Sequence, residues 1–321
     1  MTTDFYEPIK MKFSWSKYKK PILVLAPMAG YTDSAFRQVV KSLAPEVITM
    51  TELISVNAIH YGTEKTMEML HFNSKEQPLI LQLFGNNPEY FVEAAKLGEK
   101  LGFAGIDINM GCPVRKVTKN GYGSALLRTP DLACEIVQKV SEATKLPISV
   151  KTRLGWSKKE EILELAEKLE KAGTKALLIH GRTYQQGFGG EADWEPIYAV
   201  KKKVKIPVLG NGDIKSLQDF REKINNLDGV LVGRGTVGNP WLMKELQEGK
   251  PVQLSFSEKI PLISKHCKIT VKNLGEERGV REVRKHLFAY AKGFAGAVDL
   301  RKKIITTNTL AKIQKELVIH K

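Results

Sequence analysis

Residues 105–124 have the sequence GIDINMGCPVRKVTKNGYGS, a short apolar run followed by a cysteine and a basic, glycine-punctuated loop. The run 105–109 is typical of a buried strand, and Cys112 follows it almost directly. The thiol is therefore either a reactive group beside an anion-binding loop or a small buried side chain at the end of a strand. This stretch alone leaves both interpretations open.

Seven further apolar runs recur at spacings of 21 to 43 residues, at 22–27, 47–51, 79–85, 148–153, 176–181, 208–213 and 229–235. Amphipathic stretches lie between the runs, for example at 88–101, 131–144 and 158–172. Strands that are buried on both faces and separated by helices form parallel sheets. Eight such units predict an α/β fold, a (β/α)8 TIM barrel, with a doubly wound parallel sheet as the second possibility.

The strand pattern stops after Gly238. Asn239 is expected to cap a helix whose first turn contains Pro240. Residues 249–251, Gly-Lys-Pro, indicate a linker into an all-helical tail. The chain is thus predicted to divide into a barrel domain at 1–250 and a helical domain at 251–321.

The chain has a net charge of +15, and residues 251–321 hold 15 lysines and arginines against 6 acidic residues. This excess favours nucleic acid or an acidic membrane surface as partner, although a generally basic proteome would give the same sign. Three scattered cysteines are too few for a disulfide framework, which indicates a reducing, cytoplasmic location. No zinc motif occurs, no run approaches the about 18 apolar residues of a membrane span, and the run 22–26 is too short for a signal peptide.

Polar or special residues follow nearly every predicted strand. In a barrel these positions converge on the C-terminal mouth, where barrel active sites lie. A single polar residue at a strand end could simply be a hydrogen-bonded cap. Polar residues at eight strand ends together predict a functional site. The residues are Met28, Glu52, Gln82, Asn109, Cys112, Lys151, Arg153, His180, Arg182, Asn211, Asp213 and Arg234.

Two glycine-rich loops follow the last two predicted strands, GNGD at 210–213 and GRGTVG at 233–238. The second matches GxGxxG, but a Rossmann dinucleotide site would need further βαβ units, and none follow. After strands seven and eight of a barrel, the two loops predict a phosphate cradle, with ordinary tight turns as the alternative.

Lys151 lies within the run 148–153, where a lysine is costly unless it meets an anion. It is either a Schiff-base lysine or a fixed cation beside an electron-rich cofactor. With a phosphate cradle present, flavin mononucleotide (FMN) would satisfy both features. Gln82 and Met28 would then contact the flavin ring, although Gln82 could be an interior amide, and His180 is either a core histidine or a ligand.

At these residues the chain resembles the flavin-dependent dihydrouridine synthases that act on tRNA, closest to the bacterial DusB-like branch. The resemblance runs from about residue 20 to 310 in family order. The matching stretches are 26–33 (APMAGYTD), 82–85 (QLFG), 109–127, 150–156 (VKTRLGW), 180–183 (HGRT), 187–194 (GFGGEADW), 210–214, 233–241 and 281–286 (REVRKH).

The resemblance implies an FMN enzyme that takes electrons from NADPH or NADH and reduces the C5=C6 bond of uridine in folded tRNA. Hydride from flavin N5 would add at C6, and Cys112 would donate a proton to C5. The implied FMN-binding residues are Pro27, Met28, Ala29, Gln82, Lys151, His180, Asn211, Gly212, Asp213, Gly233 and Arg234.

A thiol with an ordinary pKa of about 8.5 is mostly protonated at neutral pH, as a proton donor must be. The basic residues after Cys112 would favour the thiolate, so we expect them to face RNA phosphates instead of the sulfur. A uridine in folded RNA must leave its stack to reach a barrel mouth, and phosphate contacts offset that cost.

The tail is expected to supply such contacts from one helix face that bears Arg281, Arg284, Lys285 and Lys292, with an ordinary solvated basic face as the alternative. All residues expected to contact substrate or RNA are Asn109, Arg115, Lys116, Lys119, Arg153, Arg182, Arg281, Arg284 and Lys285.

Two other interpretations stay open. A barrel flavoenzyme that reduces a small pyrimidine or enone would explain the cradle and Lys151 but not the basic tail. An RNA-binding scaffold on an inactive barrel would be colourless. The sequence does not identify the uridine, the preference for NADPH over NADH, the oligomeric state, or the roles of Cys134, Cys267 and Glu191, and it leaves ribosomal RNA open as a substrate.

Overall fold

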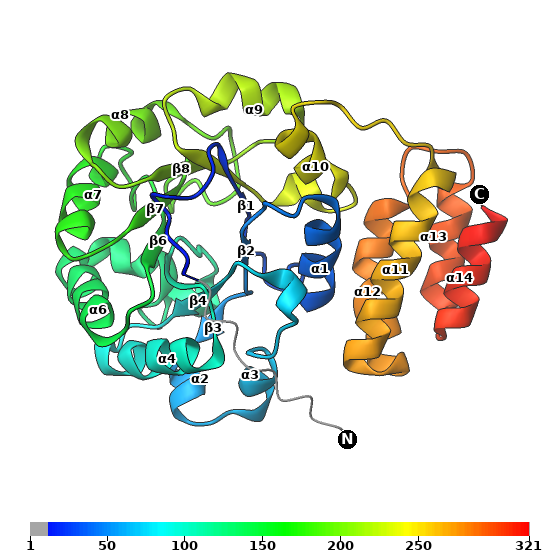
Figure 1. Cartoon of the computed structure of the whole chain (residues 1–321), viewed down its shortest axis with the longest axis horizontal. Helices are drawn as coiled ribbons and strands as arrows, with labels where there is room; N and C mark the ends of the chain where they lie inside the picture. The colour runs from blue at the N-terminus through cyan, green and yellow to red at the C-terminus, as the bar shows by residue number, and fades with distance from the viewer. Residues whose placement is uncertain (1–11, 321) are drawn as a thin grey trace.

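The computed structural model describes residues 12–320 and contains a closed parallel barrel (Figure 1). The strands follow one another in the order β1-β9-β8-β7-β6-β5-β4-β2, and a bridge between Val24 and Ile48 joins β1 to β2. They are β1 (Ile22–Leu25), β2 (Thr49–Met50), β3 (Ile54–Ser55), β4 (Leu79–Phe84), β5 (Gly105–Met110), β6 (Ile148–Arg153), β7 (Ala176–His180), β8 (Val208–Asn211) and β9 (Gly229–Val232). The predicted TIM barrel is confirmed, and closure excludes the doubly wound sheet.

Helices cover the outside of the barrel. They are α1 (Ser34–Leu43), α2 (Val56–His60), α3 (Glu64–Glu68), α4 (Pro88–Leu101), α5 (Arg115–Thr118), α6 (Pro130–Ala143), α7 (Glu161–Lys171), α8 (Glu195–Lys203), α9 (Leu217–Ile224) and α10 (Trp241–Glu248). Three short 3-10 turns, η1 (Ser74–Glu76), η2 (Gly123–Arg128) and η3 (Arg234–Thr236), complete the barrel. The two-residue strand β3, which the sequence pattern did not predict, pairs with the end of β4.

Strand β5 shows how the barrel sorts its side chains. Ile106 and Ile108 pack into the outer core between strands and helices. Because side chains alternate along a strand, Asp107 and Asn109 face the barrel interior. The interior is apolar at positions such as Ile80, Leu178 and Leu209. Its polar side chains lie on β4, β5 and β6 and, at the strand ends, also on β7 and β8.

The structure corrects two predicted helix starts. The stretch 158–172 begins its helix later, at Glu161, because the Glu161 carboxylate accepts the N–H groups of Trp156 at 2.7 Å and Lys158 at 2.9 Å and holds a loop there. Asn239 is not the N-cap of α10, since Pro240 occupies that position without a side-chain cap.

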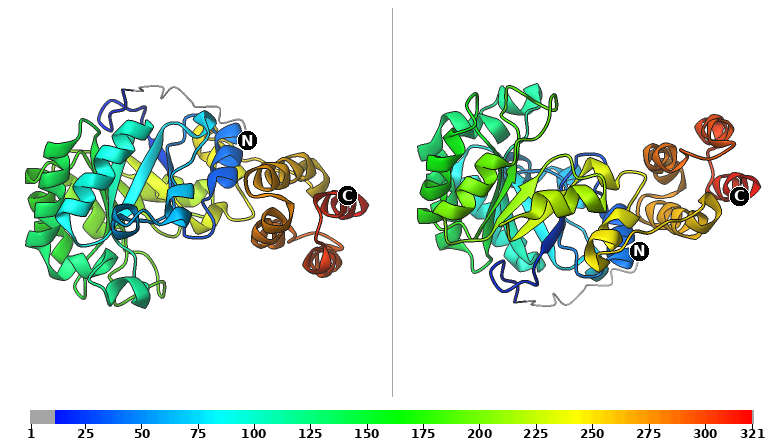
Figure 2. Two further views of the ribbon diagram at one scale, coloured as in Figure 1. Left: turned by 90° about the horizontal axis from the view of Figure 1, so that it is seen from below. Right: turned by 90° about the horizontal axis from the view of Figure 1, so that it is seen from above.

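Four helices form the tail: α11 (Phe256–Leu274), α12 (Glu276–Tyr290), α13 (Ala297–Thr306) and α14 (Leu310–Ile319). They share a core of their own and lie to one side of the barrel, next to α1 (Figure 2). At this junction the ring of Phe36 on α1 stacks on His286 of α12, with centroids 4.8 Å apart. The proposed division at residue 250 falls between α10 and α11, and residues 1–11 and 321 of the two predicted domains lie outside the described part.

No helix within residues 12–320 is long and apolar enough to cross a membrane.

Candidate active site

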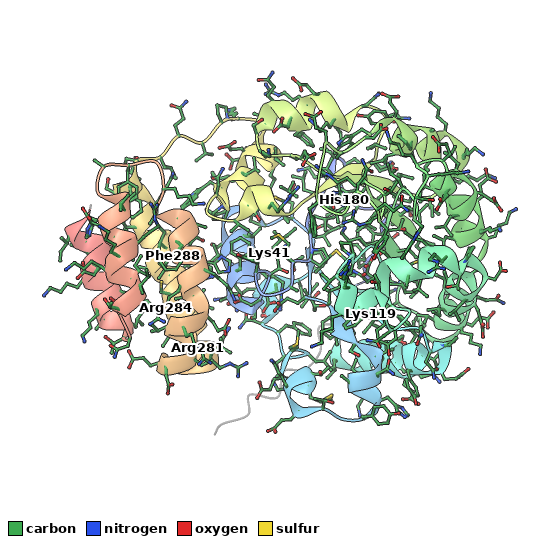
Figure 3. The ribbon with its side chains drawn as sticks, turned by 180° about the vertical axis from the view of Figure 1, so that it is seen from behind. Lys41, Lys119, His180, Arg281, Arg284 and Phe288 are labelled. Carbon is green, nitrogen blue, oxygen red and sulfur yellow. The ribbon has the colours of Figure 1, made fainter. Side chains whose placement is uncertain are left out.

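Adjacent strand ends bring several predicted site residues together inside the barrel mouth. Asn109 is the register partner of Lys151, Arg153 is the partner of His180, and His180 is the partner of Asn211. Register partners in a sheet present their side chains on the same face. Figure 3 labels His180 and Lys119 at this end of the barrel.

A chain of hydrogen bonds runs from the barrel interior to the cysteine loop. Asp107 accepts hydrogen bonds from Ser149 Oγ at 2.6 Å and from Gln82 Nε2 at 2.8 Å. Asn109 Nδ2 donates to Gln82 Oε1 at 3.0 Å, and Asn109 Oδ1 accepts the Cys112 N–H at 3.1 Å. Both amides are thereby oriented, and each retains one N–H hydrogen for a ligand.

The Cys112 thiol is half-buried and held against η2. Gly123 has a φ of 61°, and a Cβ there would lie 3.0 Å from Cys112 O and 3.1 Å from Cys112 Cβ. Burial raises the pKa of the Cys112 thiol, while the Val114 N–H, Arg153 and Lys151 act to lower it. The upward shift keeps the thiol protonated at neutral pH.

The basic residues after the cysteine lie in solvent. Helix α5 and the residue that follows it carry Arg115, Lys116 and Lys119, all three exposed. The cations that act on the pKa of the thiol are Arg153 and Lys151 instead. Arg115, Lys116 and Lys119 are not among the charges that act on the thiol, and their contact with RNA stays a prediction.

Lys151 is half-buried at the mouth and donates from Nζ to Asn211 Oδ1 at 3.2 Å. Burial lowers the pKa of Lys151 to about 8, although Asp107 acts to raise it. Burial and four neighbouring cations lower the pKa of His180 to about 2, so this imidazole is neutral. A mouth that holds several cations and a neutral histidine is suited to an anionic group.

The two glycine loops lie at the ends of β8 and β9 and present unpaired backbone donors. The N–H groups of Gly212, Asp213, Gly233 and Arg234 donate to no group within residues 12–320. Consecutive N–H groups of this kind suit a phosphate. The Asp213 carboxylate is bound elsewhere, to Arg182 Nη2 at 2.6 Å and Arg234 Nη2 at 3.2 Å. Asp213 would therefore contact a phosphate through its backbone, not its side chain.

Two arginines predicted to contact RNA are buried and hold the loop between β7 and α8. Arg153 donates to the carbonyls of Gly111, Thr183 and Gly187 at 2.7, 3.0 and 2.7 Å, which leaves its Nη2 for a ligand. Arg182 donates from Nε and both Nη atoms within the protein. These four bonds use four of its five N–H groups, and the side chain is 2% exposed, so Arg182 mainly holds the loop and its contact with RNA stays a prediction.

The loop after β1 carries Pro27, Met28 and Ala29 and links the mouth to the tail. A Cβ at Gly233 would lie 3.3 Å from Met28 Sδ, so this side chain borders the second glycine loop. Further along the loop, the ring of Tyr31 packs edge-on against His286 of α12, with centroids 5.5 Å apart.

The predicted basic face of the tail is only partly formed. Arg281 is exposed on α12 (Figure 3), and Lys285 Nζ lies 6.0 Å from the centroid of the Tyr31 ring. Arg284 instead donates from Nη2 to the Thr307 carbonyl at 2.7 Å and so ties α12 to the end of α13. Lys292 lies beyond the end of α12 at Tyr290, so it does not extend the helix face as predicted.

A basic groove separates the barrel from the tail. Its volume is about 1240 Å³, and it is lined by α1, the segment 71–77 and the facing ends of α11 and α12. Its exposed cations are Lys75 on the barrel and Lys265, Lys272 and Arg278 on the tail. We name these residues the groove cations. Glu68, 3.4 Å from Arg278, is the acidic side chain of the lining.

Sequence reasoning missed two residues of the mouth. Asp107 lies within an apolar run and was not singled out. It could have been found because it is two residues from Asn109 on the same strand, so both side chains point into the barrel interior. Phe188 was quoted only as part of a matching stretch; it is 59% exposed, and its ring centroid lies 5.5 Å from Arg153 Cζ and 5.8 Å from Arg234 Cζ at the mouth. Among the described residues, no group of three or more His, Cys, Asp or Glu side chains could hold a metal ion.

Comparison with known proteins identifies the family. The family model for Dihydrouridine synthase (Dus) matches residues 24–320. The chain is similar to "Probable tRNA-dihydrouridine synthase 1" of Synechocystis sp., with 38% identity over 89% of this chain and 82% of that protein. It is equally similar to "tRNA-dihydrouridine synthase B" of Pasteurella multocida, with 38% identity over 84% of each chain.

A solved structure, histamine dehydrogenase from Rhizobium sp. 4-9, shares the fold at 14% identity with a TM-score of 0.56. The match covers 77% of this chain and 48% of that one, about half of its length. By the match of its sequence over nearly its whole length, the chain belongs to the dihydrouridine synthase family.

Proposed function

We propose that the protein is a tRNA-dihydrouridine synthase that uses FMN and NADPH or NADH to reduce the C5=C6 bond of specific uridines in tRNA. The observation that carries this proposal is the half-buried Cys112 thiol, held at a barrel mouth near the half-buried cation Lys151, where burial raises the pKa of the thiol. The family and the names of the relatives supply the reaction. Such an enzyme would meet its tRNA in the cytoplasm.

The mouth fits a flavin mononucleotide by its donor set. The unpaired N–H groups of Gly212, Asp213, Gly233 and Arg234 would hold the phosphate. Lys151 keeps two of its three ammonium hydrogens free for the polar edge of the ring. Gln82, Asn211, His180 and the 27–29 segment would line the remaining sides.

When bound and reduced, the flavin would supply the hydride that adds to C6 of uracil. Negative charge then develops at C5 and O4 of the base. The Cys112 S–H bond breaks, and its proton goes to C5, which leaves a thiolate that solvent reprotonates. The raised pKa of the thiol suits this acid role, because the group carries its proton before the reaction. Asn109, with one free N–H hydrogen, can bind a carbonyl oxygen of the base.

An RNA substrate is supported by the charge outside the mouth. The groove cations line one groove at the junction of barrel and tail, and a small pyrimidine would not need them. A polyanion as long as tRNA can contact both the mouth and the groove.

The test is incubation of the flavin-loaded protein with NADPH and an unmodified tRNA transcript, followed by mass analysis of the RNA. We expect a gain of two hydrogen atoms at each modified uridine. The variant Cys112→Ala should bind flavin and be reduced by NADPH at the wild-type rate but modify tRNA very slowly. Full turnover by this variant would refute the proton-donor role.

A further inference from the structure

An exposed aromatic ring stands at the barrel mouth and has no part in the chemistry above. Phe188 lies in the loop between β7 and α8, with 59% of its surface exposed. Within residues 12–320, it is the one phenylalanine among the exposed large apolar side chains. Single exposed apolar residues are common on proteins, so the significance of this ring depends on how it is held.

Two buried arginines fix the backbone on both sides of the ring. Arg153 Nη1 donates to the Gly187 carbonyl at 2.7 Å. Arg182 donates to the carbonyls of the two residues after Phe188, at 3.1 and 2.6 Å. The arginines are 1% and 2% exposed. Gly187 has a φ of 57°, a conformation that favours glycine. The loop is thus built to hold the ring outward.

The same bonds bring the backbone of the Phe188 loop close to the backbone of the cysteine loop. Arg153 Nε donates at 2.7 Å to Gly111, the residue before Cys112. Arg153 Nη1 donates at 2.7 Å to the residue before Phe188. Both donors belong to one planar guanidinium group, so the two loops approach each other within the span of that group.

We infer that Phe188 is a wedge that enters the RNA base stack where the target uridine has left it. The inference rests on the proposed function, because only a uridine drawn out of folded RNA would leave such a gap beside Cys112. Apolar side chains inserted between bases fill gaps of this kind. The Arg234 guanidinium, 5.8 Å from the ring centroid and 60% exposed, lies where it can bind a phosphate next to the inserted ring.

The alternative use of the ring is to stack on the nicotinamide of the reductant. The two half-reactions separate these uses, because the reductant acts before RNA binds to the reduced enzyme. The flavin-loaded proteins to compare are the wild type, Phe188→Ala, Phe188→Leu and Phe188→Trp. Val298→Ala, at a residue 55% exposed on α13, is the matched control for loss of a surface apolar side chain.

Each protein is reduced with NADPH, and the rate is followed by flavin absorbance. The reduced protein is then mixed with saturating unmodified tRNA transcript, and reoxidation is followed. We expect Phe188→Ala to slow reoxidation by tRNA about 10- to 100-fold, the loss typical of one aromatic–base contact. Phe188→Leu should lie between, Phe188→Trp should approach the wild type, and the NADPH rates should not change.

Unchanged reoxidation in Phe188→Ala would overturn the wedge. So would an equal slowing of the NADPH step, which would assign the ring to the reductant or to the shape of the loop. A Trp variant as slow as the Ala variant would show that ring bulk is not what the RNA needs. If tRNA fails to reoxidise even the wild type, the proposed function itself is wrong, and the wedge is lost with it.

Discussion

Replacing Asp107 tests the buried network that supports the cysteine loop. Asp107 is fully buried and accepts hydrogen bonds from Gln82 and Ser149 at 2.8 and 2.6 Å. In Asp107→Leu, a somewhat larger side chain with the same number of heavy atoms accepts neither bond. In Asp107→Asn, Oδ1 can still accept from Gln82 while Nδ2 donates to the Ser149 hydroxyl, which can act as acceptor.

The expected loss of stability follows from the number of buried hydrogen-bond donors that lose their acceptor. A buried donor without a partner costs about 1–3 kcal/mol, so Asp107→Leu should lower the free energy of unfolding by about 2–6 kcal/mol. Asp107→Asn keeps both bonds and should cost about 1 kcal/mol or less at neutral pH. The two variants share the loss of the charge, so their difference isolates the hydrogen bonds.

The pH dependence has a definite sign. Burial raises the pKa of Asp107 to about 7, above its ordinary value of 3.8, although Ser149, Gln82 and Lys151 act to lower it. The stability that this group contributes is therefore fully present below about pH 4 and is lost as the pH rises through about 7. Asparagine cannot titrate, so the advantage of the wild type over Asp107→Asn should shrink as the pH rises from about 4 to about 7, the two pKa values that bound the change.

Urea unfolding followed by far-UV circular dichroism measures these differences, provided that the slope of the unfolding free energy against urea concentration (the m value) is the same in all variants. Ser149→Ala is the matched control, since it removes one donor and leaves Gln82 bound. Equal stability of the Leu and Asn variants would refute the reasoning, because the hydrogen bonds would then contribute nothing.

Three further predictions concern the thiol, its support and the groove. Gly123→Ala should cost about 1–2 kcal/mol of stability, because alanine disfavours a positive φ, and its Cβ would press on Cys112. Alkylation of Cys112 by iodoacetamide, mapped by peptide mass, should reach half its maximal rate at a higher pH than alkylation of free cysteine, since burial raises the pKa of the thiol. The double variant Lys265→Glu and Lys272→Glu should weaken tRNA binding about tenfold and reduce its salt dependence by about two counterions.

Each of these results has a clear opposite. A Gly123→Ala protein as stable as the wild type would show that the loop can move away from η2. An alkylation midpoint at or below that of free cysteine would mean that the neighbouring cations outweigh burial. tRNA binding that is unaffected by the two charge reversals, measured against Lys312→Glu on α14 outside the groove, would remove the groove from the RNA interface.

The barrel could be predicted because its strands carry a local signal. Each apolar run is long enough to be recognised, and strand parity then places Lys151 and Asn109 on the inner face. Strand β3 was not predicted, because its two residues, Ile54 and Ser55, are too few to form a recognisable hydrophobic pattern. The helix starts at Glu161 and Trp241 were shifted by side-chain and proline effects that a hydrophobic pattern does not contain.

The candidate site could be predicted only as a set of strand ends. Which charges face solvent depends on partners that are remote in sequence. Arg284 is bound by a carbonyl 23 residues away, and Arg182 by carbonyls of a loop with no regular structure. An arginine on a predicted polar face looks the same in sequence whether it binds RNA or its own backbone. Phe188 was missed for the converse reason, because an apolar residue in a loop gives no sign of its exposure.

The most direct test of the central proposal is anaerobic reoxidation of the flavin. The protein is reduced with NADPH and mixed with unmodified tRNA transcript or with free uridine, while absorbance at about 450 nm is followed for the oxidised flavin. We predict rapid reoxidation by the folded tRNA and none by uridine, because only the RNA can contact both the mouth and the groove cations. Reoxidation by small pyrimidines alone would contradict the account and make this barrel a small-molecule reductase with an incidental tail.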